Sequence, residues 1–181
     1  PDCGARYDQL ELSIACVGCG RVAWQGNGAL NFLDQRTRAE AGLIETDNVS
    51  SNRYDGQMLN LIHSLPDGLI LDCGAGSQES VYPNVVNLEV VDYPSTDVLA
   101  IGERLPFADA TFDAVVSFAV LEHVRDPFAC AAEIERVLRP GGTIYVQVPF
   151  LQPEHGYPNH FYNMTQQGLA NLFTEIETTD I

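Results

Sequence analysis

One short stretch near the middle of the chain limits the possible folds more than any other. Leu69 to Leu71 are continuously apolar, as expected for a strand that is buried on both faces of a parallel sheet. Asp72 ends this strand, and Gly74 and Gly76 permit a tight turn after it. We expect an open, mostly parallel α/β sheet, because the carboxyl ends of such strands border the ligand crevice. The polar residues 77–82 are expected to begin a short helix whose free N–H groups face that crevice.

A second strand is predicted over residues 85–91, with Glu89 near its end. An acidic residue about 20 positions past a glycine turn is placed to accept hydrogen bonds from both hydroxyls of a ribose. The alternative is an ordinary strand-end acid exposed to water. Glu79 stands where a dinucleotide-binding turn has its third glycine, which argues against a bound pyrophosphate.

The remaining apolar patterns complete an alternation of helices and strands. Residues 52–65 have the period of an amphipathic helix, which we expect Ser51 or Asn52 to cap. Asp126 and Pro127 are typical of a second helix start. Thr165 is expected to cap a third helix near the C-terminus. Strands are predicted over residues 97–101, 114–119 and 143–148.

Charge excludes some classes of partner. The chain has 25 acidic and 9 basic residues, a net charge of −16, and no lysine. Such a surface repels nucleic-acid backbones and anionic membranes. No apolar run approaches the roughly 20 residues of a membrane helix. We therefore expect a cytoplasmic protein that acts on small molecules; the oligomeric state stays open.

The order of the motifs resembles one known family. L-D-C-G-A-G, a strand-end Glu, E-R-L-P-F-A-D-A-T-F-D, L-E-H-V-R-D-P and V-L-R-P-G-G follow one another. This series resembles the class I S-adenosylmethionine (SAM)-dependent methyltransferases, most closely the type 11 family, over roughly residues 69–150. The resemblance implies a Rossmann-like, doubly wound, mostly parallel sheet. It also implies methyl transfer from SAM to a small-molecule acceptor such as a sugar or a cell-envelope precursor.

The resemblance also implies a set of SAM-binding residues. The glycine turn would hold the amino-acid part of SAM, Glu89 the ribose and Val90 the adenine, while Ser117 and Phe118 would contact the methionine amine. Ile101, followed by Gly102, stands where the family usually has an Asp bonded to the adenine amine. The implied cofactor residues are Asp72, Gly74, Ala75, Gly76, Glu89, Val90, Ile101, Gly102, Ser117 and Phe118.

A segment rich in His and aromatic residues leaves the last predicted strand and is expected to lie over the crevice. His155 and His160 are candidate general bases, and Tyr157 is a candidate for positioning the acceptor. The alternative is that these residues only pack against one another. His123, in the L-E-H-V motif, is expected to be structural.

The N-terminal cysteines indicate a metal site. Cys16 and Cys19 form a C-x-x-C knuckle, and Cys3 resembles the second half of another. The segment resembles the zinc ribbons that precede some methyltransferase domains. Cys3, Cys16 and Cys19 would then bind structural zinc, with a fourth cysteine expected just before Pro1. A redox pair or unrelated thiols are the alternatives. Cys73 and Cys130 are expected to be core residues.

Three parts of the chain are therefore predicted. Residues 1–33 form a truncated zinc-ribbon-like segment, residues 34–51 a linker with one helical turn, and residues 52–181 a SAM-binding domain whose last strands are missing. Two other functions remain open: a binding module that keeps the fold without the chemistry, and a nicotinamide-dependent oxidoreductase. The missing third glycine argues against the oxidoreductase.

Overall fold

A computed structural model describes the chain except for residues 1–6, 10–12, 17–21, 26–27, 45–48, 52, 157–158 and 178–181. Its described part contains one mixed sheet of nine strands in the order β1-β2-β3-β4-β7-β6-β5-β8-β9. Strands β4 to β9 all pair in parallel, and β1 to β4 pair antiparallel at one edge. This confirms the predicted doubly wound, mostly parallel sheet. The strands are β1 (Tyr7–Gln9), β2 (Ser13–Cys16), β3 (Val22–Gln25), β4 (Leu30–Asn31), β5 (Ile70–Cys73), β6 (Val85–Glu89), β7 (Val98–Leu99), β8 (Phe112–Phe118) and β9 (Leu138–Gln147).

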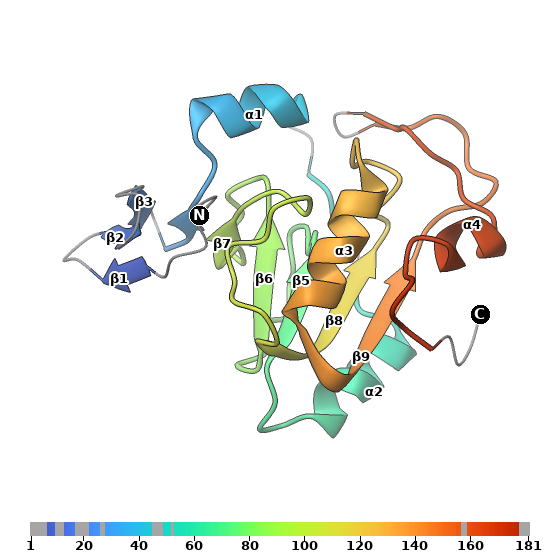
Figure 1. The fold of residues 1–181 in the computed structure, drawn as a ribbon, viewed down its shortest axis with the longest axis horizontal. Helices are drawn as coiled ribbons and strands as arrows, with labels where there is room; N and C mark the ends of the chain where they lie inside the picture. Colours follow the sequence, from blue (N-terminus) through green and yellow to red (C-terminus); the bar gives the residue numbers. More distant parts are fainter. Residues whose placement is uncertain are drawn as a thin grey trace.

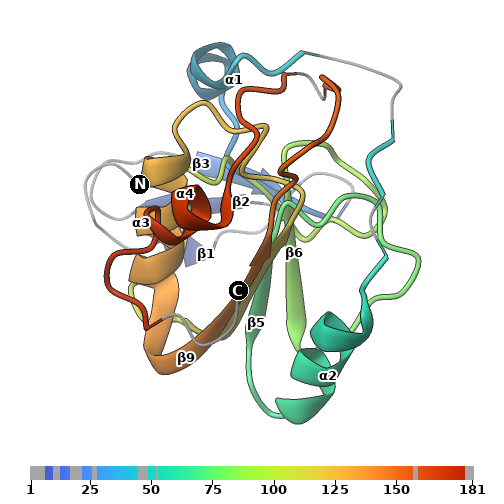
Figure 2. The same ribbon diagram turned by 90° about the vertical axis from the view of Figure 1, so that its right-hand side faces the viewer.

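Helices cover both faces of the parallel part (Figures 1 and 2). Helix α2 (Gly56–Ser64) lies against one face, where Met58 and Ile62 are 2% and 1% exposed. Helices α3 (Pro127–Val137) and α4 (Gln166–Ala170) lie on the other. Helix α1 (Gln35–Ala41) lies beyond the carboxyl ends of the central strands, beside the tail that follows β9 (Figure 1). This end of the sheet therefore has a cover built from segments far apart in the sequence.

Local chemistry explains the elements that were predicted correctly. All four residues of β5 are buried, as expected for a strand with a helix layer on each face. Asp126 accepts a hydrogen bond from Ala129 N at 3.0 Å, and Pro127 occupies the first turn of α3. Thr165 caps α4 through Gly168 N. Cys130 is buried under this layer with Cys73, which confirms that both are core residues.

One helix prediction is wrong, and the start of another predicted helix is misplaced. Residues 77–82 form bends and irregular backbone instead of a helix. Ser77 N donates to Ser50 O, and Gln78 N donates to Ser95 Oγ, so partners outside the segment take the amides that would begin a helix. Helix α2 starts at Gly56 rather than near Asn52, because Asp55 accepts from the amides of Gln57 and Met58. Ser51 instead forms an isolated bridge with Gly76.

Several strand boundaries differ from the predictions. β6 ends at Glu89 and β7 spans only Val98–Leu99, whereas β9 begins at Leu138 and includes the Pro-Gly-Gly segment. β8 begins two residues early, at Phe112. In residues 34–51, α1 is longer than one turn because Asp34 caps it through Thr37 N.

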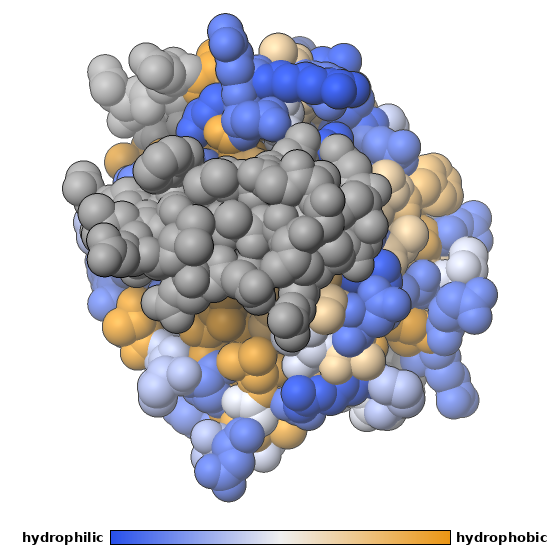
Figure 3. Space-filling view, turned by 60° about the vertical axis from the view of Figure 1, so that its left-hand side comes forward, coloured by the Kyte–Doolittle hydropathy of each residue, from blue (hydrophilic) through white to orange (hydrophobic). Residues whose placement is uncertain are grey.

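The charged residues of the chain are visible on the surface of its described part. Hydrophilic residues gather at the top of the face in Figure 3, where α1 lies, and apolar residues form separate smaller areas. Within the described residues, no helix combines the length and apolar character that a membrane crossing requires.

Candidate functional site

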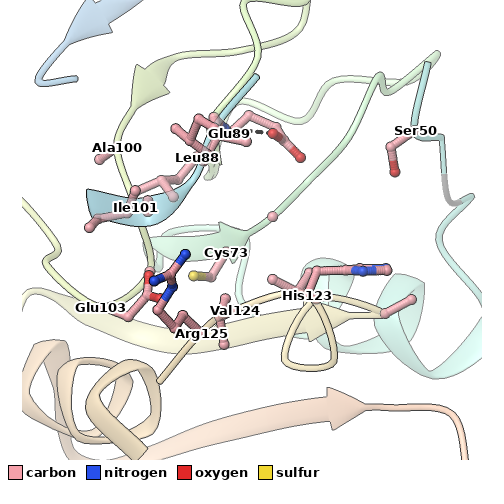
Figure 4. A pocket seen from close by; sticks show the side chains of 17 residues that line it. Ser50, Cys73, Leu88, Glu89, Ala100, Ile101, Glu103, His123, Val124 and Arg125 are labelled. Atoms are coloured by element: carbon pink, nitrogen blue, oxygen red, sulfur yellow. Dashed lines mark hydrogen bonds between the residues drawn. The ribbon is translucent and has the colours of Figure 1, made fainter. Parts of the chain in front are cut away.

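A pocket opens at the carboxyl ends of β5, β6 and β7, below α1. The space between its walls is about 810 Å³ when the open solvent at its mouth is included. Figure 4 shows Glu89 at the top of the pocket, with Cys73 and His123 below it. The pocket is lined by Ala41, Leu43, Ser50, Cys73, Gly74, Leu88, Glu89, Val90, Ala100, Ile101, Gly102, Glu103, Ala119, Val120, His123, Val124 and Arg125.

Glu89 is the acidic group on the β6 side of the pocket. Its Oε2 accepts from Val90 N at 2.6 Å and from Val91 N at 3.3 Å, and its Oε1 accepts from Gly76 N at 3.1 Å. Burial raises the pKa of this carboxyl, and the three amides oppose that shift. A carboxylate has about four acceptor positions, so a bound hydroxyl still finds one on Glu89.

Asp72 is placed differently from the expectation of two carboxylates in one hollow. It lies on the same sheet face as Glu89 but outside the pocket lining, and it is 2% exposed. Tyr54 covers it and donates its hydroxyl to Asp72 Oδ2 at 2.8 Å. Burial raises the pKa of Asp72 to about 7; the Tyr54 hydrogen bond lowers it and the charge of Glu89 raises it further. Asp72 is therefore a buried residue beside the glycine turn and does not face the pocket.

The two glycines of the turn have different surroundings. A Cβ on Gly74 would lie 2.3 Å from Val120 Cγ2, so Val120 occupies the space that this glycine leaves. A Cβ on Gly76 would lie 2.8 Å from Ser50 O. Both have positive φ, 88° and 65°, which favours glycine. Gly74 lines the pocket, whereas Gly76 and the buried Ala75 lie outside its lining.

The apolar wall of the pocket contains the departure from the family pattern. Val90, Ile101 and Gly102 all line it, and Ile101 is 8% exposed. A Cβ on Gly102 would lie 2.6 Å from Cys130 Sγ. The buried thiol of Cys130 therefore leaves room only for glycine at this position. This wall offers apolar contact to a flat ring, as adenine requires.

On β8, the residues that line the pocket come later than predicted. Ser117 is fully buried, and both Ser117 and Phe118 lie outside the lining. The lining residues are Ala119 and Val120, and the chain turns sharply there because Ala119 has φ of 55°. Sequence reasoning also missed Arg125 and the contribution of Ala41, Leu43 and Ser50. The L-E-H-V-R motif was a usable signal for Arg125; nothing local in residues 41–50 indicates the pocket.

Three histidines gather beside the pocket mouth. The ring centroids of His123 and His155 are 4.9 Å apart, and those of His155 and His160 are 4.4 Å apart. The tail is held against the turn after β8, since Phe161 N donates to Glu122 O at 2.7 Å and His123 Nδ1 contacts Asn159 O at 2.6 Å. The predicted bases therefore meet His123 next to the pocket. Burial lowers the pKa of His123, while burial raises that of Glu122.

Other predicted residues lie outside the described part. Tyr157, Cys3 and Cys19 are not described, and of Cys16 only its place at the end of β2 is. Zinc binding at these cysteines therefore stays a prediction.

The central part of the chain is similar to a known domain family. Residues 71–146 match the family described as methyltransferase domain. A probable SAM-dependent methyltransferase of Mycolicibacterium smegmatis is 28% identical over 169 residues, which cover 83% of this chain and 65% of the relative. The demethylmenaquinone methyltransferase of Renibacterium salmoninarum is 32% identical over 123 residues, 59% of this chain and 51% of the relative.

The fold has a counterpart among solved structures. A candidate methyltransferase of Bacillus halodurans superposes with a TM-score of 0.51 at 16% identity, over 65% of this chain and 67% of that one. The chain thus spans about half to two thirds of the length of these relatives. Residues 71–146 are thus similar to methyltransferase domains, and the pocket lies at the carboxyl ends of the strands in this region.

Proposed function

We propose that this protein is a SAM-dependent methyltransferase that acts on a small-molecule acceptor. The observation that carries the proposal is Glu89, a strand-end carboxylate that lines a pocket with an apolar wall and a glycine turn. When bound, SAM supplies an electrophilic methyl group.

The composition of the pocket lining fits SAM. Glu89 would accept a ribose hydroxyl, and Val90 and Ile101 would contact the adenine. Gly74 and Ala119 would lie along the amino-acid part. Glu89 and Glu103 favour a cationic ligand over a dinucleotide with its pyrophosphate. This charge supports a methyltransferase over the alternative oxidoreductase.

Methyl transfer requires alignment of the acceptor more than chemical activation, because charge disperses in its transition state. Groups at the pocket mouth therefore matter most for their placement. Of the two predicted bases, His160 has both ring nitrogens in hydrogen bonds, to His155 N and Tyr162 O. His155 Nε2 remains available to take a proton from an acceptor. Sugars and cell-envelope precursors carry such hydroxyl groups, which supports them as the acceptor class.

Titration calorimetry with SAM, S-adenosylhomocysteine and NAD tests the proposal. We expect the first two to bind with similar affinity and NAD to give no heat. Glu89→Gln should weaken SAM binding about 10- to 150-fold, because a hydrogen bond to a charged group contributes about 1.5–3 kcal/mol.

Asp67→Asn is the matched control. Asp67 is exposed in the turn after α2 and lies outside the pocket lining, so its loss changes net charge alone. Melting curves verify that each variant is folded. Equal SAM affinity in folded Glu89→Gln, or tighter binding of NAD than of SAM, contradicts the proposal.

A further inference from the structure

Three side chains beside the pocket present potential ligand atoms to one another. Glu122, His123 and His155 each offer one ligand atom, and all three atoms lie within 4.8 Å of one another. His123 Nε2 is 3.7 Å from Glu122 Oε1. We infer that Glu122, His123 and His155 form a binding site for a divalent transition-metal ion.

Glu122 is the strongest single indication. Its side chain is 0% exposed, and neither carboxylate oxygen has a hydrogen-bond partner among the described residues. A buried polar group without a partner is unfavourable. A cation between Glu122 and the two imidazoles supplies the missing partner.

The hydrogen bonds of the two histidines leave one ring nitrogen of each free. His123 Nδ1 faces Asn159 O at 2.6 Å, and His155 Nδ1 faces Pro153 O at 3.1 Å. A carbonyl oxygen only accepts, so each Nδ1 carries the hydrogen and each Nε2 presents a lone pair. Histidine ligands in metal sites usually donate their other N–H to such a carbonyl, which fixes the ring.

His160 is excluded as a ligand by the same reasoning. Its Nδ1 accepts from His155 N at 3.2 Å, and its Nε2 faces Tyr162 O at 3.0 Å. Both nitrogens are therefore used. His160 instead accepts the hydrogen bond from the backbone N–H of His155 and so helps to hold His155 in place.

Small movements would bring the ligands to coordination distance. Donors on one tetrahedral zinc ion are roughly 3.3 Å apart, given Zn–N bonds of about 2.0 Å. The observed separations, up to 4.8 Å, exceed this by an amount that side-chain rotation covers. The backbone already holds the site, because Phe161 N and Tyr162 N both donate to Glu122 O.

The ligand set indicates the kind of ion. Two imidazoles and one carboxylate suit Zn²⁺, Fe²⁺, Co²⁺ or Mn²⁺, whereas Mg²⁺ prefers oxygen ligands alone. Three protein ligands leave a position for an outside oxygen. On the proposed function, that oxygen is the acceptor hydroxyl: the ion would lower its pKa, its proton would pass to solvent, and His155 would act as a ligand in place of the base considered above.

Metal titration of the full chain, after treatment with EDTA and in the absence of SAM, tests this site. We expect one equivalent of Zn²⁺ to bind in the wild type and more than tenfold weaker binding at that site in Glu122→Gln and in His155→Ala. Mg²⁺ should give no comparable binding. His63→Ala is the matched control, because His63 is an exposed histidine on α2.

The design separates this site from other metal sites and from SAM binding. Zinc taken up by the N-terminal cysteines would be the same in all four proteins, so only the difference between them counts. His155 is half-buried, so His155→Ala tests the site even if Glu122→Gln does not fold. Equal zinc affinity and stoichiometry in wild type and folded His155→Ala, or Mg²⁺ binding as tight as that of Zn²⁺, overturns the inference. SAM calorimetry on the same samples tests the proposed function separately.

Discussion

The acidic residues in and next to the glycine turn have different positions: one lines the pocket and the other is buried outside its lining. Asp72 and Glu89 have the same residue class and lie on the same sheet face, yet only Glu89 lines the pocket. Tyr54 causes the difference, since its hydroxyl covers Asp72. The motif predicted which residues meet at the turn. Its local sequence contains no information on Tyr54, which lies 18 positions away, within the helix predicted over residues 52–65.

The buried position of Asp72 has a consequence for stability. Burial raises its pKa to about 7 from a reference value of 3.8. A raised folded-state pKa means that the stabilising contribution is complete below the unfolded pKa and is lost as pH rises through the folded pKa. Between about pH 4 and pH 7, Asp72 should therefore make the protein progressively less stable.

Asp72→Asn tests this prediction. The free energy of unfolding of wild type, relative to that of the variant, should fall by about 2–4 kcal/mol between pH 4 and pH 8, since one pKa unit corresponds to about 1.4 kcal/mol. Urea unfolding at several pH values measures it. Asp67→Asn should show no such trend. A wild-type-minus-variant difference that is constant or rises with pH contradicts the assignment.

At the scale of elements, side-chain caps and long-range partners decided the boundaries. The helical period predicted that α2 exists and which residues it buries, Met58 and Ile62 among them. Its start was misplaced because the predicted caps, Ser51 and Asn52, look as suitable as Asp55. The contact that favours Asp55 comes from β9, where Tyr145 donates to Asp55 Oδ2 at 2.6 Å. No local pattern contains a contact between residues 90 positions apart.

Asp55→Ala should therefore destabilise more than the loss of a cap alone. The variant removes two amide contacts and leaves the Tyr145 hydroxyl without its partner. We expect a loss of about 1–3 kcal/mol, measured by urea unfolding. Asn60→Ala, on the exposed side of the same helix, should change stability by less than about 0.5 kcal/mol.

A double-mutant cycle isolates the link between α2 and β9. Tyr145→Phe should destabilise the wild type but have little further effect in Asp55→Ala, because the partner is already gone. Additive effects of the two substitutions would mean that the hydrogen bond contributes nothing to stability.

The whole molecule combines a predictable sheet with a cover that the sequence did not indicate. The apolar strands and the glycine turn between them were sufficient to predict a mostly parallel sheet. The pocket, in contrast, includes Ala41, Leu43 and Ser50, which come from residues predicted as a linker. Their role depends on α1 lying across the strand ends (Figure 1), a tertiary arrangement without a local signature.

Net charge is a property of the molecule as a whole, and it should make stability depend on salt. The chain has 25 acidic residues against 9 arginines. Several arginines already form ion pairs, such as Arg136 with Glu133 and Arg139 with Asp113, and salt weakens such contacts. Exposed pairs contribute only about 0–1 kcal/mol each, whereas the excess charge of −16 acts across the entire surface. We therefore expect repulsion between acidic groups to dominate.

The melting temperature should accordingly rise as NaCl increases from about 0.05 M to 1 M at pH 7.5, because the screening length falls to about 3 Å at 1 M. Differential scanning calorimetry measures this, and sucrose at matched osmolality controls for effects other than ionic screening. The rise should become smaller at pH 4.5, where part of the carboxyl groups are protonated and the repulsion is weaker. If the melting temperature stays level or falls with NaCl at pH 7.5, the ion pairs outweigh the repulsion and the acidic surface does not limit stability.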